Sequence, residues 1–281
     1  MDFRILIRKF WQRSPEYNFL TFFRSSKRGK TIPEYERLVG FPRYKKTTTK
    51  FFGKDIKLVD ATSFLFLYEE IFEKETYKFV SETNQPFIVE GGANIGLSII
   101  YYKKLYPQAE VFAFEPDPNV FEALQENIKS FGFSGVTLLQ KGLWKEDGRM
   151  KFYAEGSDGG RIALDSDKHN IVNIDVVSLR EYLSKPVDFL NLDIEGSEMD
   201  VLESCRDLLK NVKNIFLEYH SFSDSRQSLD RILKVLSAAG FRYQIHHVGI
   251  VSEHPFVERK VLNGMDMQLN IFGFRDSKQT H

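Results

Sequence analysis

The chain has a single cysteine, no net charge and no long apolar run, and each shortage excludes a class of protein. Cys205 is the only cysteine, so no disulfide can form within the chain, which fits a reducing compartment and predicts a cytoplasmic location. The formal net charge of +0 argues against a general nucleic-acid-binding protein. No apolar stretch approaches the length of a transmembrane span, and the first residues lack the apolar centre of a signal peptide. Phenylalanine is abundant instead, with 26 residues among 281, enough for a sizeable aromatic core.

Charge is unevenly distributed along the chain. Residues 1–30 carry eight Lys and Arg residues against Asp2 and Glu16, and aromatic residues are interleaved among them. A basic segment with aromatics is typical of peripheral contact with an anionic membrane surface. The other interpretation, which we favour, is a helical cap that packs on the domain and turns its basic face to water.

From residue 86 onward, short apolar runs alternate with helical periods, which is typical of a parallel α/β sheet. We therefore divide the chain into an N-terminal helical and hairpin extension, residues 1–85, and a main domain, residues 86–281. In the extension, residues 44–59 favour a hairpin around Gly53, and Asp60 is placed to begin a helix over residues 64–79. The main domain should contain strands at residues 87–90, 110–114, 136–140, 187–192, 214–217, 241–247 and 267–274, further extended pieces at 148–155 and 171–177, and helices at 96–106, 119–131, 178–183, 198–209 and 225–239.

The stretch Phe87–Ser98, FIVEGGANIGLS, predicts a strand, a tight turn and a helix. This geometry points free backbone N–H groups and a helix N-terminus at a ligand, and glycine allows the ligand to approach the backbone closely. The spacing Glu90-x-Gly92-x-Asn94-x-Gly96 differs from the G-x-G-x-x-G pattern of dinucleotide enzymes. An acid at the end of the strand suits a cationic ligand group better than a diphosphate. A purely structural turn is the alternative.

Polar residues follow the apolar run of each of the first five expected strands. In open α/β sheets, ligands bind beyond the carboxyl ends of the strands. Glu115 ends the second strand, 19 residues after Gly96, and a carboxylate at that place can accept both hydroxyls of a ribose. This role is common to NAD and S-adenosylmethionine (SAM) enzymes, so it predicts a nucleoside ligand without choosing between them. The polar ends are Glu90, Glu115, Gln140-Lys141, Asp193 and Glu218-Tyr219-His220.

Four segments together resemble the FkbM-type methyltransferases: IVEGGANIGLSIIYY, FAFEPDPNVFEALQENI, VDFLNLDIEGSEMDVL and IFLEYH. The similarity covers about residues 86–275, and the chain departs from it at Glu90, where an aspartate is commoner in the family. The resemblance implies a class I SAM-methyltransferase fold, which is Rossmann-like, with a seven-stranded, mostly parallel sheet whose last strand is antiparallel. It also implies SAM as cofactor and methylation, usually of a hydroxyl on a sugar or natural product. A small-molecule or carbohydrate acceptor would then be the partner.

Carried over by position, the resemblance implies a set of cofactor-binding residues. Asp193 would stand next to the transferred methyl group. Glu115 would hold the ribose, with Pro116 and Asp117 beside it, and Gln140, Lys141 and Gly142 would lie near the adenine. The methionine end of SAM would be lined by Glu90, Gly91, Gly92, Ala93, Asn94, Gly96 and Ser98.

Methyl transfer to a hydroxyl needs a base or a metal ion, because an alcohol is a poor nucleophile at neutral pH. His220 is the best base by residue type. Alternatively, Asp193, Glu218 and His220 would bind Mg²⁺ or Mn²⁺, an arrangement similar to that of catechol-type O-methyltransferases, with Glu195 and Glu198 near enough in sequence to help. An ordinary hydrogen-bonded histidine at a strand end is the structural alternative for His220.

Other functions remain open at this point. N- or C-methylation would use the same fold. A nicotinamide-dependent oxidoreductase is disfavoured by the glycine spacing, by the acid at Glu90 and by the absence of a crossover helix between the last two strands. A catalytically silent SAM-fold module that binds a partner through residues 1–85 is disfavoured because Glu90, Glu115, Asp193 and His220 are all present. In the glycine-rich middle loop, Gly159-Gly160-Arg161 is a further candidate for binding an anionic group of the acceptor.

Overall fold

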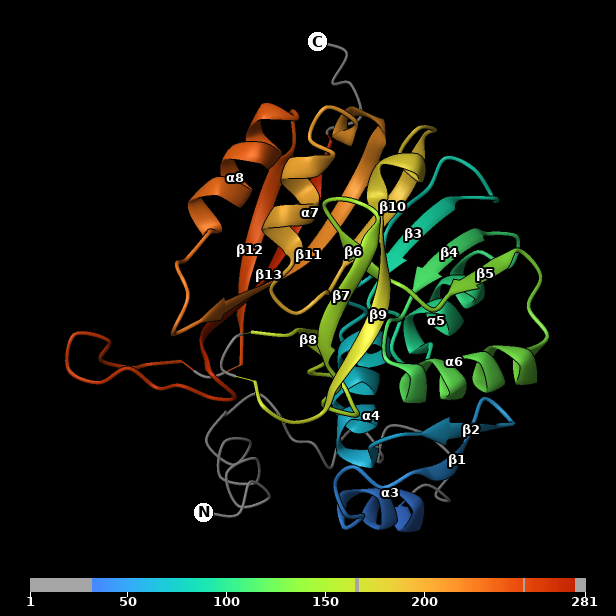
Figure 1. Cartoon of the computed structure of the whole chain (residues 1–281). Coiled ribbons are helices and arrows are strands. Elements are labelled where there is room, and N and C mark those ends of the chain that lie inside the picture. The colour runs from blue at the N-terminus through green and yellow to red at the C-terminus, as the bar shows by residue number, and fades with distance from the viewer. Residues whose placement is uncertain (1–31, 165–166, 250, 276–281) are drawn as a thin grey trace.

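The computed structural model describes residues 32–164, 167–249 and 251–275, and its centre is a seven-stranded sheet (Figure 1). The strand order is β12-β13-β11-β10-β3-β4-β5, in which β13 is antiparallel to both of its neighbours and the other pairs are parallel. This confirms the expected class I SAM-methyltransferase fold. The strands are β3 (Phe87–Gly91), β4 (Glu110–Phe114), β5 (Val136–Leu139), β10 (Val187–Leu192), β11 (Val212–Phe222), β12 (Arg242–Val248) and β13 (Met265–Phe274).

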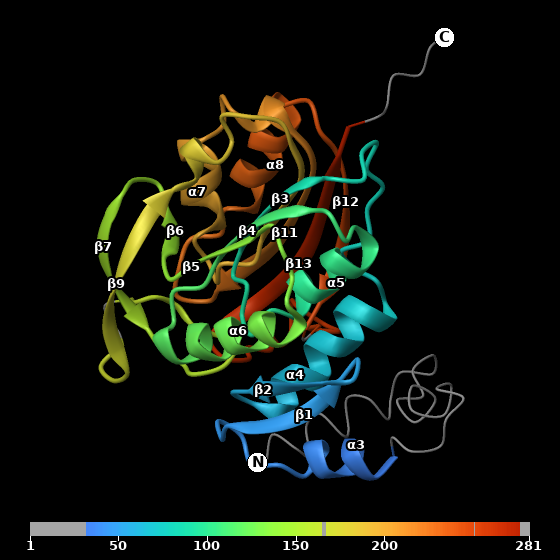
Figure 2. The ribbon, with the colours of Figure 1, turned by 90° about the vertical axis from the view of Figure 1, so that its right-hand side faces the viewer.

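Helices cover both faces of this sheet (Figure 2), which is why β3 is buried along its whole length and reads as an unbroken apolar run before Glu90. On one face lie α5 (Leu97–Leu105) and α6 (Pro118–Phe131), and on the other lie α7 (Glu198–Ser204) and α8 (Leu229–Ala238). Asp117 caps α6 by accepting the backbone N–H of Asn119, and Gly132 ends the helix in the left-handed conformation. The crossover helices therefore begin at the carboxyl edge of the sheet, where the polar residues gather.

The extension packs against the first helical face. Its described elements are α3 (Ile32–Val39), β1 (Thr47–Phe51), β2 (Lys54–Leu58), α4 (Ala61–Tyr68) and a π-helix, η1 (Glu69–Glu73). The hairpin around Gly53 is confirmed. The predicted helix 64–79 is wrong in its bounds, because it begins directly after its cap Asp60 and stops before Glu75, whose positive φ turns the chain away. The predicted basic cap or membrane segment, residues 1–30, lies outside the described residues.

A second, four-stranded sheet stands beside the carboxyl edge, in the chain between β5 and β10. It is formed by β6 (Gly142–Trp144), β7 (Gly148–Tyr153), β8 (Arg161–Ile162) and β9 (Ile171–Ser178), in the order β6-β9-β7-β8. The extended pieces predicted at 148–155 and 171–177 pair with each other antiparallel, and Phe152, Ile174 and Val176 form their own small core. The helix expected at 178–183 is a short 3₁₀ turn, η2 (Leu179–Glu181).

Strand β11 is longer than the sequence predicts. It continues to Phe222 because its outer partner β13 pairs with it that far, with His220 opposite Gln268. Glu218 and His220 therefore lie within the strand and not after its end. Helix α7, in contrast, stops at Ser204, and turns lead from it to a 3₁₀ helix, η3 (Leu209–Asn211).

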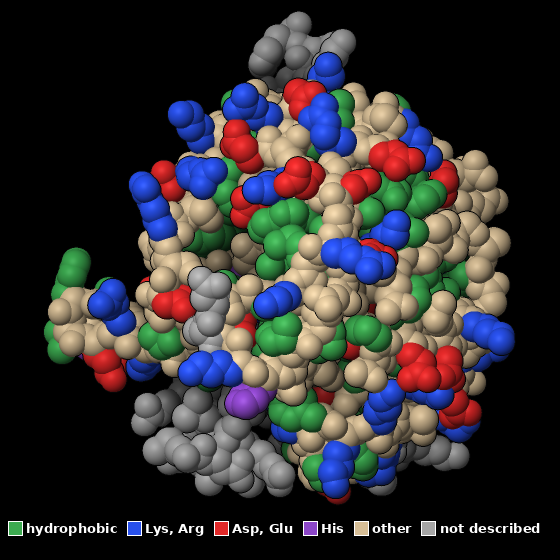
Figure 3. Space-filling view, viewed as in Figure 1, with side chains coloured by type: hydrophobic (Ala, Val, Ile, Leu, Met, Phe, Trp, Pro, Cys, Tyr) green, Lys and Arg blue, Asp and Glu red, His purple; other side chains and the backbone are tan. Residues whose placement is uncertain are grey.

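The loop between β12 and β13 projects from the body of the molecule, with hydrophobic side chains at its tip (Figure 3). Phe256 and Val257 in this loop are almost fully exposed. Within the described ranges, no helix is both long and apolar enough to cross a membrane.

Candidate active site

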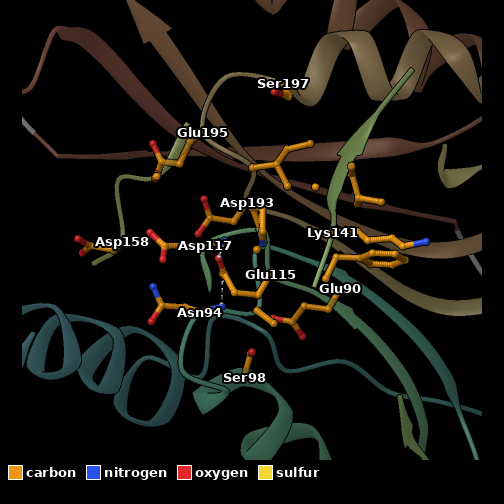
Figure 4. A pocket seen from close by; sticks show the side chains of 18 of the residues that line it. Glu90, Asn94, Ser98, Glu115, Asp117, Lys141, Asp158, Asp193, Glu195 and Ser197 are labelled. Atoms are coloured by element: carbon orange, nitrogen blue, oxygen red, sulfur yellow. Dashed lines mark hydrogen bonds between the residues drawn. The ribbon is translucent and has the colours of Figure 1, made fainter. Parts of the chain in front are cut away.

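A cavity opens at the carboxyl ends of β3, β4 and β10, enclosing about 870 Å³ including its open mouth (Figure 4). The main sheet supplies its floor, the extension one wall and the four-stranded sheet another. The residues around it are Leu67, Ile71, Tyr77, Glu90, Gly92, Ala93, Asn94, Leu97, Ser98, Phe114, Glu115, Pro116, Asp117, Lys141, Gly142, Leu143, Phe152, Ser157, Asp158, Gly160, Ile162, Ile174, Asp193, Ile194, Glu195 and Ser197.

Gly92 and Gly96 of the glycine-rich turn are each required for a different structural reason. Gly92 has a φ of 84°, and a Cβ on it would lie 1.8 Å from the backbone oxygen of Asp193. Its backbone N–H and that of Ala93 both donate to the carbonyl of Phe114. Gly92 therefore holds three strand ends together. Gly96 begins α5, and a Cβ there would meet Leu124 of α6 at 2.8 Å, so this glycine allows two helices to approach.

Glu90 carries a buried carboxyl group at the floor of the cavity. Its Oε1 accepts a hydrogen bond from Asn191 Nδ2 at 3.3 Å, and among the described residues Oε2 has no hydrogen-bond partner. Burial raises the pKa of Glu90 to about 8, although the polar side chains of Ser98, Tyr102 and Asn191 oppose the rise. A buried acceptor atom without a partner is costly to the protein, so Glu90 is suited to bind a cationic or hydrogen-bond-donating ligand group.

Glu115 lies on the next strand end, with both oxygens already hydrogen-bonded to the backbone. Oε2 accepts from the N–H of Asn94 at 3.0 Å and Oε1 from that of Asp117 at 2.9 Å. Burial raises the pKa of Glu115 to about 8. Each carboxylate oxygen retains a further acceptor position, so a pair of adjacent hydroxyls can still bind. Asp117 also lines the cavity, and its buried Oδ2 has no hydrogen-bond partner among the described residues.

The four-stranded sheet closes one side of the cavity with apolar side chains: Phe152, Ile162 and Ile174. Lys141 and Gly142 lead into this sheet and line the cavity too. Sequence reasoning missed the apolar wall, because it is created by pairing between β7 and β9. The one available signal was the pair of extended pieces on either side of a Gly/Asp-rich loop.

Five ionisable side chains from three segments meet beside the cavity, around the buried ring of His220. Nε2 of the ring lies 3.5 Å from Glu195 Oε1, and 3.9 Å from both Asp193 Oδ1 and Glu218 Oε1. Nδ1 lies 3.1 Å from Glu198 Oε1. One candidate ligand atom each from Asp193, Glu195 and His220 falls within 4.8 Å of the others, the spacing of a metal-binding group. We call these five side chains the acid–histidine cluster.

Burial and mutual repulsion shift the protonation of the acid–histidine cluster. Burial raises the pKa of Asp193 to about 7 and that of Glu195 to about 8, against the attraction of His220. Burial also raises the pKa of Glu218 well above its usual range. For His220, burial acts downward, yet Glu195, Glu198 and Glu218 outweigh it and raise the pKa well above 6.5. Such a concentration of carboxylates around one imidazole is a site for a proton or a cation.

The structure brings most of the predicted site residues to the cavity. Those that do not line it are Gly91, Gly96, Gln140, Glu218 and His220, the last two lying behind Asp193 and Glu195. Glu218 accepts from Gln268 Nε2 and is not among the three residues with metal-ligand spacing, where Glu195 stands instead. Lining residues that the sequence analysis did not single out include Leu67, Ile71 and Tyr77 of the extension and Ser157 and Asp158 of the middle loop.

Arg161, a candidate for binding an anionic acceptor group, already has a carboxylate partner. Its Nη2 donates to Asp167 Oδ1 at 2.8 Å, and the guanidinium lies 5.0 Å from the ring centroid of Tyr153 and 5.5 Å from that of Phe222. The bidentate pair with Asp167 occupies the donors that an anion would use.

Comparisons with known proteins agree with this architecture. Residues 90–243 match the Methyltransferase FkbM domain. The chain is 32% identical over 203 residues to Methyltransferase 1 of Beauveria bassiana, covering 63% of this chain and 80% of that protein. It is 32% identical over 210 residues to Methyltransferase sdnD of Sordaria araneosa, covering 60% and 80%. It is 23% identical over 159 residues to the 2-O-methyltransferase NoeI of Sinorhizobium fredii, covering 49% and 65%.

The domain match spans more than half of the chain and includes the glycine-rich turn, Glu115 and the whole acid–histidine cluster. This decides between the two cofactor classes that the strand ends left open, in favour of SAM and against a nicotinamide. The chain belongs to the FkbM methyltransferase family and is a SAM-dependent methyltransferase.

Proposed function

We propose that this enzyme transfers the methyl group of SAM to a hydroxyl of a sugar, a glycan or a glycosylated natural product. The observation that carries the proposal is the acid–histidine cluster beside the cavity, where Asp193 Oδ1 and Glu195 Oε1 face the same nitrogen of His220. A hydroxyl acceptor needs such a group to take its proton, whereas an amine or thiol acceptor depends on it less. The name of NoeI, a 2-O-methyltransferase, supports an oxygen acceptor.

The cavity residues fit SAM. Glu90 Oε2, which has no hydrogen-bond partner in the described part of the chain, is an acceptor for the cationic methionine end, and Glu115 has acceptor positions left for the ribose hydroxyls. The apolar wall of the four-stranded sheet beside Lys141 and Gly142 suits the adenine ring. Bound SAM supplies an electrophilic methyl group. The protein's part is to hold that group in line with the acceptor oxygen and to keep water away from both.

We propose that Asp193, Glu195 and His220 bind a divalent cation such as Mg²⁺ or Mn²⁺. Carboxylate oxygens with one imidazole suit these ions, and a bound cation would lower the pKa of an acceptor hydroxyl. The cluster otherwise places several carboxylates together with a single positively chargeable group, which a cation would compensate. This assignment replaces Glu218 of the sequence prediction with Glu195. In the absence of a metal ion, His220 would take the acceptor proton only through Asp193 or Glu195, which stand between its ring and the cavity.

The extension supplies the acceptor side of the cavity in this proposal. Leu67, Ile71 and Tyr77 line it, and Tyr77 packs edge-on against Phe216 with ring centroids 4.9 Å apart. Ser63 of α4 accepts from Ser157 of the middle loop at 2.7 Å, and the carbonyl of Ser157 accepts from Asn94 Nδ2. Extension, middle loop and glycine-rich turn thereby form one rim, and the acceptor would have to enter past it.

Isothermal calorimetry with S-adenosylhomocysteine, with and without Mg²⁺ or Mn²⁺ and with NADH in parallel, tests the cofactor part. We expect micromolar binding of S-adenosylhomocysteine alone, and binding of NADH in its place would overturn the proposal. A screen of hydroxylated sugars against matched amino sugars, read by S-adenosylhomocysteine release, tests the acceptor. Turnover of the amine acceptors alone would reject O-methylation.

A further inference from the structure

One carboxylate of the acid–histidine cluster touches neither the cavity nor the proposed metal-facing nitrogen. Glu198, the first residue of α7, is only 1% exposed, and its Oε1 lies 3.1 Å from Nδ1 of His220. The same oxygen accepts the backbone N–H of Gly196 at 3.0 Å. Glu198 thus joins β11, which carries His220, to the loop that carries Asp193 and Glu195.

The loop that carries Asp193 and Glu195 has an unfavourable backbone conformation that other contacts must stabilise. Glu195 and Gly196 both have positive φ, 52° and 96° respectively. A non-glycine residue in the left-handed region costs free energy, and successive left-handed residues are rare. The hydrogen bond from Gly196 to Glu198 fixes the turn at the point where Glu195 bends back toward His220.

Because Nδ1 of the His220 ring faces Glu198, the other nitrogen, Nε2, faces the carboxylates of Asp193, Glu195 and Glu218. When the imidazole carries a single proton, a carboxylate at Nδ1 keeps that proton there and leaves the lone pair on Nε2. On the other side of the ring, Gln268 Nε2, a donor to Glu218, lies 3.4 Å from His220 Nε2. The carboxylate of Glu198 therefore favours the tautomer with the proton on Nδ1.

We propose that Glu198 is a positioning residue: it holds His220 in the Nδ1-protonated tautomer and fixes the Asp193–Glu195 loop, so that Nε2 of His220 and the two carboxylates face one bound cation. This inference rests on the proposed function, because it concerns the same site. It accounts for why the sequence places a second glutamate three residues after Glu195 with a glycine between them.

The test compares Glu198→Ala and Glu198→Gln with the matched control Glu203→Ala. Glu203 lies on the same helix, is partly exposed and pairs with Arg206. Mn²⁺ affinity is measured by electron paramagnetic resonance in the presence of S-adenosylhomocysteine. The tautomer is read by ¹⁵N NMR of histidine-labelled protein at a pH high enough for a neutral ring, with the His220 signal identified from its loss in His220→Asn.

We expect the wild type and Glu203→Ala to carry the proton on Nδ1. In Glu198→Ala the proton should move to Nε2 and Mn²⁺ affinity should fall about 10- to 100-fold, while S-adenosylhomocysteine affinity stays within about twofold. Glu198→Gln keeps an acceptor oxygen, so it should keep the proton on Nδ1, and its Mn²⁺ affinity should lie between those of the wild type and Glu198→Ala. If Glu198→Ala were to lose S-adenosylhomocysteine binding through misfolding, the tautomer and the Mn²⁺ affinity of Glu198→Gln would decide the proposal, and wild-type Mn²⁺ affinity in that variant would contradict it.

An unchanged tautomer and unchanged Mn²⁺ affinity in a folded Glu198→Ala would overturn the proposal and leave Glu198 as a helix-terminal packing residue. If wild-type protein bound S-adenosylhomocysteine but no Mn²⁺, the metal part of the proposed function would fail, and an unshifted tautomer in Glu198→Ala would still count against Glu198. If wild-type protein bound no S-adenosylhomocysteine, the cavity assignment would fail independently of both.

Discussion

The backbone oxygen of Asp193 occupies the space that a side chain on Gly92 would need, because a Cβ at Gly92 would lie 1.8 Å from it. The backbone N–H of Asp193 also donates to the carbonyl of Gly91 at 3.1 Å. The turn after β3 and the end of β10 are therefore in direct backbone contact. Through this contact, the turn after β3 sets the position of Asp193 within the acid–histidine cluster.

Gly92→Ala should break this contact. The positive φ and the overlap with Asp193 together should lower the free energy of unfolding by about 3 kcal/mol or more, and S-adenosylhomocysteine binding should weaken with it. Urea unfolding and calorimetry measure the two effects. Gly148→Ala is the control, since a Cβ there meets nothing within 4 Å. Equal stability of both variants would show that the approach of the two strand ends is not required.

Glu115→Ala should weaken S-adenosylhomocysteine binding. It removes the proposed ribose contact and leaves the N–H groups of Asn94 and Asp117 without their acceptor. A charged hydrogen bond contributes about 1.5–3 kcal/mol, so affinity should fall by at least about tenfold. Calorimetry checks this, with Glu110→Ala at the exposed start of the same strand as control. Undiminished affinity would remove Glu115 from the ribose site.

His220→Ala should separate cofactor binding from catalysis. The ring does not line the cavity, so S-adenosylhomocysteine affinity should change by less than about threefold, whereas Mn²⁺ affinity and acceptor turnover should be lost. His247→Ala, on the exposed edge strand β12, is the matched control. Full turnover by His220→Ala would exclude the imidazole both as base and as metal ligand.

The ligand-free enzyme should lose stability as the pH rises from about 5 to 8. Burial raises the pKa of Glu90 from 4.5 to about 8, so in that window the folded state binds a proton that the unfolded state has released. The free energy of unfolding must then fall with rising pH. Urea unfolding at pH 5, 6.5 and 8 measures the slope. In Glu90→Gln the slope should be shallower, because this position no longer titrates, and an identical slope would contradict the buried, protonated Glu90.

The sequence by itself determined how the strands and helices of the main sheet follow one another along the chain, and which polar residues lie at the carboxyl edge. Glu90, Glu115 and Asp193 each end a short apolar run, and parallel strands bring such ends to one edge of a sheet. This is local information: alternation of apolar runs, a cap such as Asp117 and a stop such as Gly132 are all read within a few residues. The same holds for the glycine-rich turn.

Only the tertiary structure decided which side chains meet. Glu218 and Glu195 are both acids near an expected strand end. Pairing with β13 continues β11 past Glu218, whose carboxyl group then accepts a hydrogen bond from Gln268. The positive φ of Glu195, in contrast, turns its carboxylate toward His220. The apolar wall of Phe152 and Ile174 depends on pairing between β7 and β9, and Tyr77 reaches the cavity only because the extension packs on the sheet. These contacts join residues far apart in the chain, and their free energy depends on partners that no local pattern contains.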